Sequence, residues 1–459
     1  MTRKSLGILL AIIVVSVALR VGTALYLGDI VDAPPLLTDQ RSYDALGARL
    51  ITGHGFSFDR GWYPFTQADT PTAHWSFLYS LWVAAVYAVF GPHPLAVRVV
   101  QSIIGGILLP LLVYRLTFRL SEPREKNHFG QALTDRGFDS TWLALIAAGI
   151  SAVYFYFVLY AATLMTETFF ICGLLFILEQ TIVLAEAPTW RHGLIWGIGL
   201  GLTTLLRQSI LPGIVVMVLW LLWVGYRRHT LRRIMLALAT AVGVLILFIV
   251  PFTVRNYVTY HQFLLLNSNA GYAMFSAQNP MHGVNFQEFE GAPVPPELIG
   301  LNEAQLDQEL MRRGIGFVLA DPIRYLRLSF SRAIDYIEFW PTADTTLINN
   351  LGRVGSFGLF MPFMLYGLFL ALRYAFTRSA QIDVTTSPLM LCVLFSLAYS
   401  ILHIFTWAMP RYRLPVDAVL MSFAALALYQ IARWVSAHLS RQKSPTAAKK
   451  AVSTGGNVV

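Results

Sequence analysis

The residues best suited to chemistry in this sequence are carboxylates and arginines at the ends of its apolar stretches. They come from five separate segments: Asp39, Asp44, Asp69, Glu167, Arg207, Arg255, Arg411 and Arg413. A carboxylate in such a place can accept a proton from a hydroxyl group, and a guanidinium offers forked donors to a phosphate. Because charges near hydrocarbon are costly, we expect the set to share one polar cavity.

A simpler explanation exists for each charge taken alone. A long charged side chain next to a loop can reach the nearest water without any function, and for a single residue this explanation is the better one. The cavity is favoured for the set as a whole. It predicts that Asp39 and at least two of the arginines line the same cavity.

Asp39 lies in a short segment, LLTDQRSYDALGARLITGHGF, that follows the first apolar stretch. Helical spacing relates Asp39, Tyr43, Leu46 and Leu50, and two glycines then end the pattern. We therefore expect a short amphipathic helix lying on the membrane. An Asp near a helix start often caps it, so spacing alone leaves capping and catalysis equally open for Asp39.

Two other stretches place arginines where an anionic head group could bind. In PFTVRNYVTYHQFLLLNSNAGYAMFSAQNP, Arg255 and Asn256 stand at the end of an apolar run. In TWAMPRYRLPVDAVL, Arg411 and Arg413 occupy a short proline-bounded turn between two apolar runs. Outer loops of membrane proteins ordinarily avoid arginine, so the pair indicates a partner such as a lipid phosphate.

Composition identifies the class of protein that must position these residues. Of 459 residues, 56% are apolar and 13% charged, which excludes a soluble globular protein and indicates an all-α polytopic membrane protein. The net charge of +9 comes from basic residues dispersed in short loops, so we expect no nucleic-acid partner.

Cofactor signals are weak in this sequence. Cys172 and Cys392 lie inside apolar runs, which argues against a disulfide framework or a thiolate metal site. The histidines do not pair at metal-ligand spacing, and no nucleotide-binding loop or nucleophile motif is present. No cofactor is predicted with certainty, and a divalent cation held by carboxylates stays open.

The apolar stretches predict about ten transmembrane helices, each needing roughly 20 residues. They fall at about residues 6–27, 95–118, 140–160, 164–185, 234–253, 355–372, 386–407 and 414–434, with two more in 194–225 hinged near Arg207. Residues 75–90 form a shorter apolar run that suits either a span or an interfacial helix.

The positive-inside bias favours the interfacial choice for residues 75–90. Both termini then face the cytoplasm, and the basic loops near residues 115–136, 227–233 and 373–378 do so too. The outer face receives two long loops, 28–94 and 254–350. We predict one transmembrane domain, 1–434, in the cell (inner) membrane, followed by a disordered cytoplasmic tail, 435–459.

Six stretches together resemble the GT-C superfamily of membrane glycosyltransferases, and more narrowly its family 39-like members. These are relatives of protein O-mannosyltransferases and of lipid A aminoarabinose transferases. The matching stretches, in order, are TDQRSYDALGARLITGHGF, DTPTAHWSFLYSLWVAAVYAVFGPHPLAVRVVQSIIGGILLPLLVYRL, LYAATLMTETFFICGLLFILE, GIGLGLTTLLRQSILPGIVV, PFTVRNYVTYHQFLLLNSNAGYAMFSAQNP and PRYRLPVDAVL. The resemblance extends over nearly the whole chain to about residue 434.

The resemblance implies an inverting glycosyltransferase with interfacial helices in its first outer loop. Such an enzyme moves a sugar from a polyprenyl-phosphate donor to a lipid, glycan or protein acceptor on the outer face. Asp39 matches the family's catalytic aspartate and would act as general base. Glu167 matches an acidic position that opens the fourth span, where it would orient a sugar hydroxyl or a loop arginine.

Further residues complete the predicted site. Arg207, Arg255, Arg411 and Arg413 are the candidates for stabilising the phosphate, and Tyr43, Asp69 and Asn256 are further predicted substrate contacts. The chain departs from the family at one point. Protein O-mannosyltransferases carry an Asp-Glu pair in the first loop, whereas Gln40 follows Asp39 here, and Asp69 is the candidate for a second carboxylate.

The alternative from another class is a transporter or flippase of a lipid-linked or anionic substrate. It would require ionisable residues near the middle of the bilayer and two pseudo-symmetric halves. The sequence instead shows charges at the ends of its spans, and it shows no matched pair of broken helices.

Overall fold

Helices form nearly all of the regular structure. A computed structural model describes residues 2–31, 38–62, 64–125, 127–287, 290–343, 345–377 and 383–443. Its α-helices are α1 (Arg3–Leu27), α2 (Thr38–Ile51), α3 (Phe77–Phe90), α4 (Pro94–Ser121), α5 (His128–Thr134), α6 (Ser140–Val153), α7 (Phe155–Ala161), α8 (Glu167–Glu186), α9 (Trp190–Leu206), α10 (Leu211–Arg227), α11 (Leu231–Tyr260), α12 (Ala270–Gln278), α13 (Glu303–Ala320), α14 (Pro322–Ile337), α15 (Leu347–Arg353), α16 (Leu359–Phe376), α17 (Pro388–Phe405) and α18 (Leu414–Lys443).

Short helical turns join several of these elements. They are η1 (Gln208–Ile210), η2 (Pro280–His282), η3 (Pro296–Leu298), η4 (Val354–Gly358), η5 (Val384–Thr386) and η6 (Pro410–Arg413). Two of them matter for the site, because η1 joins α9 to α10 and η6 joins α17 to α18.

The long apolar helices confirm a polytopic membrane protein. Within the described residues, eight helices are long and apolar enough to span a membrane, and the bent pair α6 and α7 makes nine. The tenth predicted span corresponds to α9, which has 17 residues. Helix α18 continues beyond the predicted span end at residue 434 as far as Lys443, and residues 444–459 of the predicted tail lie outside the described part.

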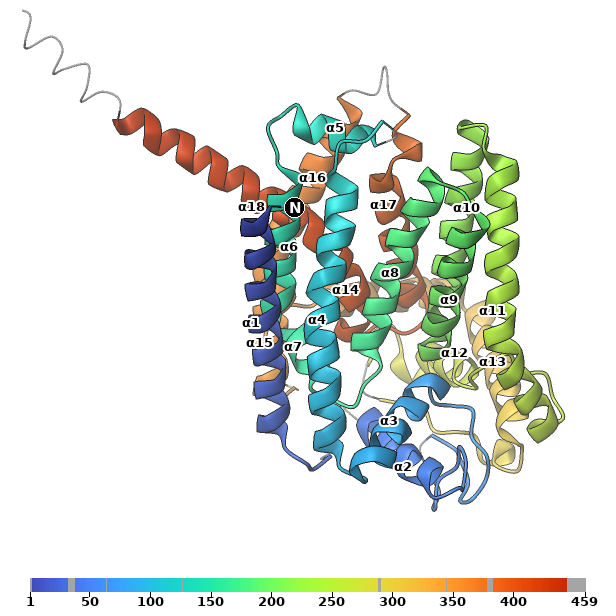
Figure 1. The fold of residues 1–459 in the computed structure, drawn as a ribbon. Coiled ribbons are helices and arrows are strands. Elements are labelled where there is room, and N and C mark those ends of the chain that lie inside the picture. Colours follow the sequence, from blue (N-terminus) through green and yellow to red (C-terminus); the bar gives the residue numbers. More distant parts are fainter. Residues whose placement is uncertain are drawn as a thin grey trace, which may run out of the picture.

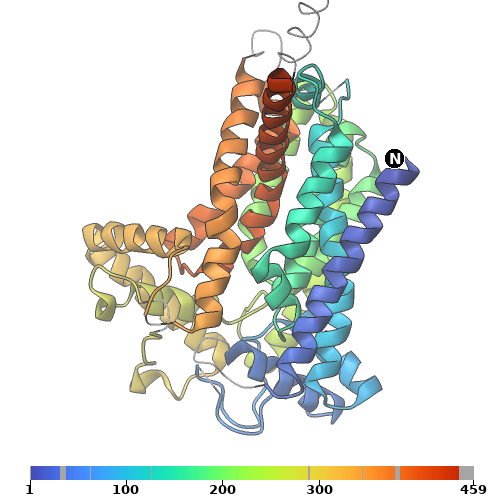
Figure 2. The same cartoon turned by 90° about the vertical axis from the view of Figure 1, so that its left-hand side faces the viewer.

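The long helices run side by side in one bundle (Figure 1). The N-terminus and the far end of α18 lie at the upper end of this view, whereas α2 and α3 lie at the lower end. Figure 2 shows the segment that includes α13 and α14 projecting to one side, roughly across the direction of the long helices. The predicted second outer loop, 254–350, is therefore largely helical.

The two helices expected in the first outer loop are present as α2 and α3. Each has 14 residues, which gives a length of about 21 Å at 1.5 Å per residue. This length is well short of the roughly 30 Å of a hydrocarbon core. Ser76 caps α3, because its side chain accepts a hydrogen bond from the N–H of Tyr79.

A buried arginine stabilises the bend between α6 and α7, which differ in direction by 58°. Arg20 of α1 is fully buried and donates to the carbonyl oxygens of Ser151 (3.1 Å) and Ala152 (3.0 Å). These carbonyls lie at the end of α6, where an α-helix leaves its last acceptors unsatisfied. Arg20 thus supplies donors that neither water nor lipid could supply at this depth.

Glycines allow α9 and α11 to pack closely. A Cβ atom on Gly193 would lie 2.3 Å from the carbonyl oxygen of Ala237, and one on Gly197 would lie 2.8 Å from that of Ala241. These two glycines are four residues apart and share one face of α9, an arrangement that lets helix backbones approach in membranes. The close packing fixes the first half of α9 against α11, and Arg207 follows the other end of α9.

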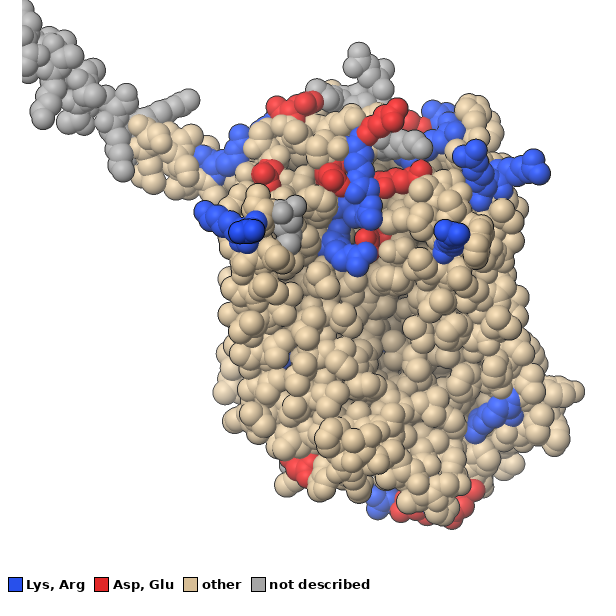
Figure 3. Space-filling model, viewed as in Figure 1, with Lys and Arg blue, Asp and Glu red and all other residues tan. Residues whose placement is uncertain are grey.

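Charged side chains avoid the middle of the bundle surface (Figure 3). In this view most blue side chains gather at the upper end, and the wide central band is almost entirely tan. An uncharged band between two charged ends is what a bilayer requires of a spanning protein.

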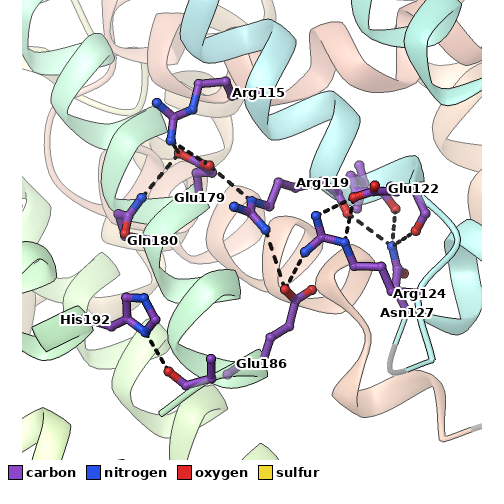
Figure 4. A network of polar contacts seen from close by, with 12 residues as sticks. Arg115, Arg119, Glu122, Arg124, Asn127, Glu179, Gln180, Glu186 and His192 are labelled. Carbon is purple, nitrogen blue, oxygen red and sulfur yellow. Dashed lines mark hydrogen bonds and ion pairs between the residues drawn. The ribbon is translucent and has the colours of Figure 1, made fainter. Parts of the chain in front are cut away.

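A network of ion pairs joins α4 to α8 at the upper end (Figure 4). Glu179 is buried and pairs with Arg115 and Arg119, each at about 3.0–3.1 Å. Glu186 pairs with Arg119 at 3.6 Å and with Arg124 at 2.5 Å. The network fixes one end of α8, and the opposite end of that helix begins with Glu167.

One buried carboxylate holds the two long loops together at the lower end. Glu303 accepts hydrogen bonds from five groups: the hydroxyls of Thr66, Thr72, Tyr260 and Ser268 and the backbone N–H of Ala73. Their lengths lie between 2.6 and 3.1 Å. A carboxylate with this many donors replaces its lost hydration. The loop between α2 and α3 is thereby tied to α11, α13 and the segment before α12.

Candidate active site

A cavity of about 830 Å³ opens where the two long loops meet the ends of α9, α10 and α17. We call it the site cavity. Its wall contains Asp39, Tyr43, His74, Trp75, Ser76, Arg207, Gln208, Asn267, Asn269, Asp307, His403, Trp407, Arg411 and Tyr412, together with apolar side chains. The cavity thus brings together charged groups from α2, the α9–α10 hinge and η6.

The first ion pair of the cavity joins residues from opposite ends of the sequence. Arg411 Nη1 lies 2.8 Å from Asp39 Oδ2, across 372 positions of sequence. Asp39 is the second residue of α2, and Arg411 lies in η6, the turn between α17 and α18. The Nε atom of Arg411 is buried and has no hydrogen-bond partner, so this guanidinium keeps a donor for another group.

The second ion pair lies beside the first. Glu167 opens α8 and is almost fully buried, and its Oε1 lies 3.1 Å from Arg207 Nη1. Arg207 occupies the break between α9 and η1 in an extended conformation. The other oxygen, Glu167 Oε2, is buried without a partner. Of the two partners predicted for Glu167, a sugar hydroxyl or an arginine, the protein itself supplies the arginine.

Tyr412 links the two arginines. The guanidinium carbons of Arg207 and Arg411 each lie 5.2 Å from the centre of the Tyr412 ring, a distance at which a ring face attracts a cation. His403 stacks on the same ring, with 4.8 Å between ring centres. The two positive groups are therefore held on one aromatic platform beside the cavity.

Tyr43 and Gln40 fix the position of α2 against the rest of the site. The Tyr43 ring meets Trp75 and Tyr79 edge-on, with ring centres 5.8 and 4.7 Å apart. Burial raises the pKa of Tyr43, and the charge of Asp39 acts in the same direction, so its hydroxyl stays protonated. Gln40 accepts a hydrogen bond from the N–H of Leu164 (3.1 Å) and so ties α2 to the segment before Glu167.

Two of the predicted arginines lie outside the wall of the cavity. Arg413 is buried and pairs with Asp417 at 3.2 Å, and it also donates to the carbonyl oxygen of Tyr336. Arg255 lies within 6 Å of three aromatic rings and donates to Asn256 Oδ1 at 3.0 Å. Both side chains are engaged by other residues of the protein, away from the cavity wall.

The other two predicted contacts are also engaged elsewhere. Asn256 is buried and donates to the carbonyl oxygens of Leu264 (3.2 Å) and Leu266 (2.7 Å), which shapes a loop that lines the cavity. Asp69 is largely exposed and lies 2.5 Å from Arg49. Four of the nine predicted residues thus line the cavity, and Glu167 joins them through Arg207.

Tyr412, His74 and Asp307 are among the wall residues that the sequence reasoning missed. Tyr412 had a signal, since it lies between the two arginines that were singled out. His74 and Asp307 had none, because a lone histidine and one acidic residue of a surface-like helix resemble many others. Burial raises the pKa of Asp307 to about 6, although it accepts a hydrogen bond from the N–H of Gly271 (2.7 Å).

Metal coordination finds little support in the described part of the chain. There, no group of three or more His, Cys, Asp or Glu residues gathers closely enough to hold a metal ion. Two carboxylates at the site, Asp39 and Glu167, each have an arginine as partner instead.

The fold and the site define a multi-pass helical membrane protein with a charged cavity at one end of the bundle, and that fold is the GT-C fold. The model of the family described as dolichyl-phosphate-mannose-protein mannosyltransferase matches residues 132–253. The resemblance to GT-C membrane glycosyltransferases that the six motifs indicated is thereby confirmed.

Solved structures with the same fold are distant in sequence. The archaeal oligosaccharyltransferase AglB from Archaeoglobus fulgidus, in complex with an inhibitory peptide and a dolichol-phosphate, aligns with a TM-score of 0.55 at 16% identity, covering 97% of this chain and 52% of AglB. The apo form of the Archaeoglobus fulgidus oligosaccharyltransferase gives 0.57 at 16% identity, with 99% and 53% covered.

ArnT from Cupriavidus metallidurans, bound to undecaprenyl phosphate, gives a TM-score of 0.49 at 13% identity, with 93% of this chain and 60% of ArnT covered. The chain spans about half the length of AglB. No curated protein matches it in sequence.

Proposed function

We propose that the protein is an inverting glycosyltransferase that moves a sugar from a polyprenyl-phosphate donor to an acceptor hydroxyl in the site cavity. The observation that carries the proposal is the ion pair between Asp39 and Arg411 in the wall of that cavity, with Arg207 in the same wall. A base and two phosphate-binding cations thus face one space that can hold a sugar. The family match supports the class of donor.

In this reaction the acceptor oxygen forms a bond to the anomeric carbon while the bond from that carbon to the phosphate oxygen breaks. The electron pair of the broken bond leaves with the phosphate, and the acceptor proton passes to the carboxylate of Asp39. Attack opposite the leaving group inverts the anomeric centre. One displacement needs one base, and of Asp39 and Glu167 only Asp39 lies in the wall of the site cavity.

Charge explains the need for two guanidiniums. The donor phosphate is a diester with one negative charge, and the released polyprenyl phosphate is a monoester that gains negative charge as the bond breaks. Donors already directed at the place where charge develops lower the barrier. Arg411 has an unused donor at Nε, and Arg207 is held beside it on Tyr412.

Asp39 and Arg411 act on opposite ends of the reaction in this scheme. While the site is empty, each neutralises the other, which keeps two charges tolerable near hydrocarbon. When the phosphate binds, Arg411 gains a second anionic partner and Asp39 is free to face the acceptor hydroxyl.

The cell (inner) membrane and its outer face are part of the proposal. The positive-inside bias relates basic ends of spans to the cytoplasm, and the blue side chains of Figure 3 gather at the end opposite α2 and α3. This distribution supports cytoplasmic termini and a cavity that opens outward. A lipid, glycan or protein in that compartment would be the acceptor.

Reconstitution in proteoliposomes with a panel of undecaprenyl-phosphate and dolichyl-phosphate sugars tests the proposal. We expect acceptor-dependent release of polyprenyl phosphate with at least one donor, and its loss in Asp39→Asn. Asp59→Asn is the matched control, because Asp59 lies in the same loop with its side chain exposed. Movement of intact donor between leaflets without release would contradict the proposal and favour a flippase.

A further inference from the structure

His74 lies in the wall of the site cavity and has no part in the reaction described above. It belongs to the loop between α2 and α3, next to Trp75 and Ser76 in the same wall. Its ring meets Phe65 and Trp75 edge-on, with ring centres 5.5 and 5.0 Å apart. These contacts fix the plane of the imidazole.

One ring nitrogen of His74 is tied to the protein. The backbone of Ser268 acts on the imidazole as a hydrogen-bonding group, and since Nδ1 has no partner, we assign this contact to Nε2. Ser268 is itself held in place, because its hydroxyl donates to Glu303 Oε2 (3.1 Å) and its N–H donates to the carbonyl oxygen of Ala73 (3.1 Å). The ring therefore faces a backbone segment that is itself held by α13, through Glu303, and by the loop between α2 and α3, through Ala73.

The other ring nitrogen has no partner. Nδ1 of His74 is buried and makes no hydrogen bond, which is unfavourable for a polar atom. Burial lowers the pKa of His74, although the charges of Glu303 and Asp39 act to raise it. The ring is therefore neutral near pH 7. With the proton on Nε2 toward the backbone, Nδ1 offers a lone pair and accepts hydrogen bonds only.

A lone-pair acceptor selects the chemistry of its ligand. A phosphate diester offers acceptors alone and would be repelled by Nδ1, whereas a sugar hydroxyl can donate to it. Asp39 and His74 both line the site cavity, and the charge of Asp39 acts on the imidazole. Trp75 and Trp407 in the same wall supply the flat apolar surfaces on which sugar rings pack.

We propose that His74 is a substrate-binding residue whose Nδ1 accepts a hydrogen bond from a sugar hydroxyl of the bound substrate. The inference rests on the proposed function and adds a determinant of sugar specificity to it. The hydroxyl belongs either to the donor sugar or to a sugar acceptor, and the experiment separates these two.

Two isosteric substitutions test the role of Nδ1. The amide oxygen of Asn in His74→Asn can take the place of Nδ1, whereas the amide of Gln in His74→Gln reaches the place of Nε2 and keeps the bond to the Ser268 backbone. We expect His74→Gln to raise KM about tenfold, the value of one hydrogen bond of roughly 1.4 kcal/mol. We expect the KM of His74→Asn to stay within about threefold of the wild-type value.

The measurement is KM for the best donor of the panel and, separately, KM for the acceptor, with folding checked by size exclusion and thermal unfolding. A rise in donor KM assigns the hydroxyl to the transferred sugar, and a rise in acceptor KM assigns it to the acceptor. A second readout uses a deoxy donor series. For the wild type, KM should rise about tenfold with the one analogue that lacks the contacted hydroxyl. For His74→Gln, KM should be the same for this analogue as for the complete donor.

The opposite ranking, with Asn worse than Gln, would overturn the inference, because it would mean that only the bond to Ser268 matters. Unchanged KM values in both variants would overturn it too. Failure of the proposed function is a separate result, since it would appear as absence of turnover in the wild type itself.

Discussion

Replacing Arg411 by lysine separates the two tasks that its guanidinium performs. Arg411 holds Asp39 at 2.8 Å through Nη1 and keeps Nε free. A lysine ammonium preserves the charge and can pair with Asp39, so we expect the protein to fold. A compact ammonium has no fork with which to hold a carboxylate and a phosphate together.

The size of the effect follows from the lost phosphate contact. Two unit charges 4 Å apart interact by about 4 kcal/mol at an effective dielectric constant of 20, and removing one donor to a developing charge typically costs about 100-fold to 1000-fold in kcat. Because lysine keeps part of the attraction, we expect Arg411→Lys to lower kcat by roughly 100-fold. Donor KM should change much less.

The assay is release of polyprenyl phosphate from the best donor under saturating conditions. Arg227→Lys is the matched control, since Arg227 pairs with Asp383 at 2.6 Å at the far end of α10. Combining Arg411→Lys with Asp39→Asn should cost less than the product of the single effects, because the two residues act in one step. A kcat within threefold of wild type would refute the role of Arg411.

Three further predictions concern the framework of the site. Because burial raises the pKa of Asp307 from 3.8 to about 6, the folded protein binds this proton more tightly than the unfolded chain, and stability falls as pH rises between these values. Asp307→Asn should therefore make the thermal unfolding temperature less dependent on pH across that range. An unchanged pH dependence of the unfolding temperature would contradict the assignment. Glu303→Gln leaves one acceptor oxygen for five donors, so hydrogen exchange of residues 66–73 should accelerate at least about tenfold; unchanged protection would contradict this. Glu179→Gln removes the anionic partner of two arginines and should destabilise by about 3 kcal/mol with kcat unchanged, and a large fall in kcat would show that the α4–α8 network does more than fix α8.

Hydropathy was sufficient to predict most of the fold. A bilayer imposes length and apolarity on every span, so the sequence predicts the spans, and the structure has helices there. The predicted break at Arg207 lies between α9 and η1. The bend between α6 and α7 was not predicted, because it depends on Arg20 of α1, whose partners lie more than 130 positions away.

The site was harder to predict, because its ion pairs join remote segments. Nothing local to Asp39 indicates that Arg411 will lie beside it. The expected cavity and the motif resemblance pointed to both residues, but neither predicted that they pair. Arg413, by contrast, had a visible local partner. Asp417 follows four residues later, at the spacing that pairs side chains on one helix face. This spacing favours a structural role for Arg413.

The kinetics of Asp39→Asn test the central claim most directly. Asparagine keeps the size of the side chain and a hydrogen-bond acceptor toward Arg411, but it cannot take a proton. We predict that single-turnover transfer at saturating donor falls by about 100-fold or more, with donor affinity within a few-fold of wild type. Transfer by Asp39→Asn at the wild-type rate would contradict the assignment of Asp39 as the base.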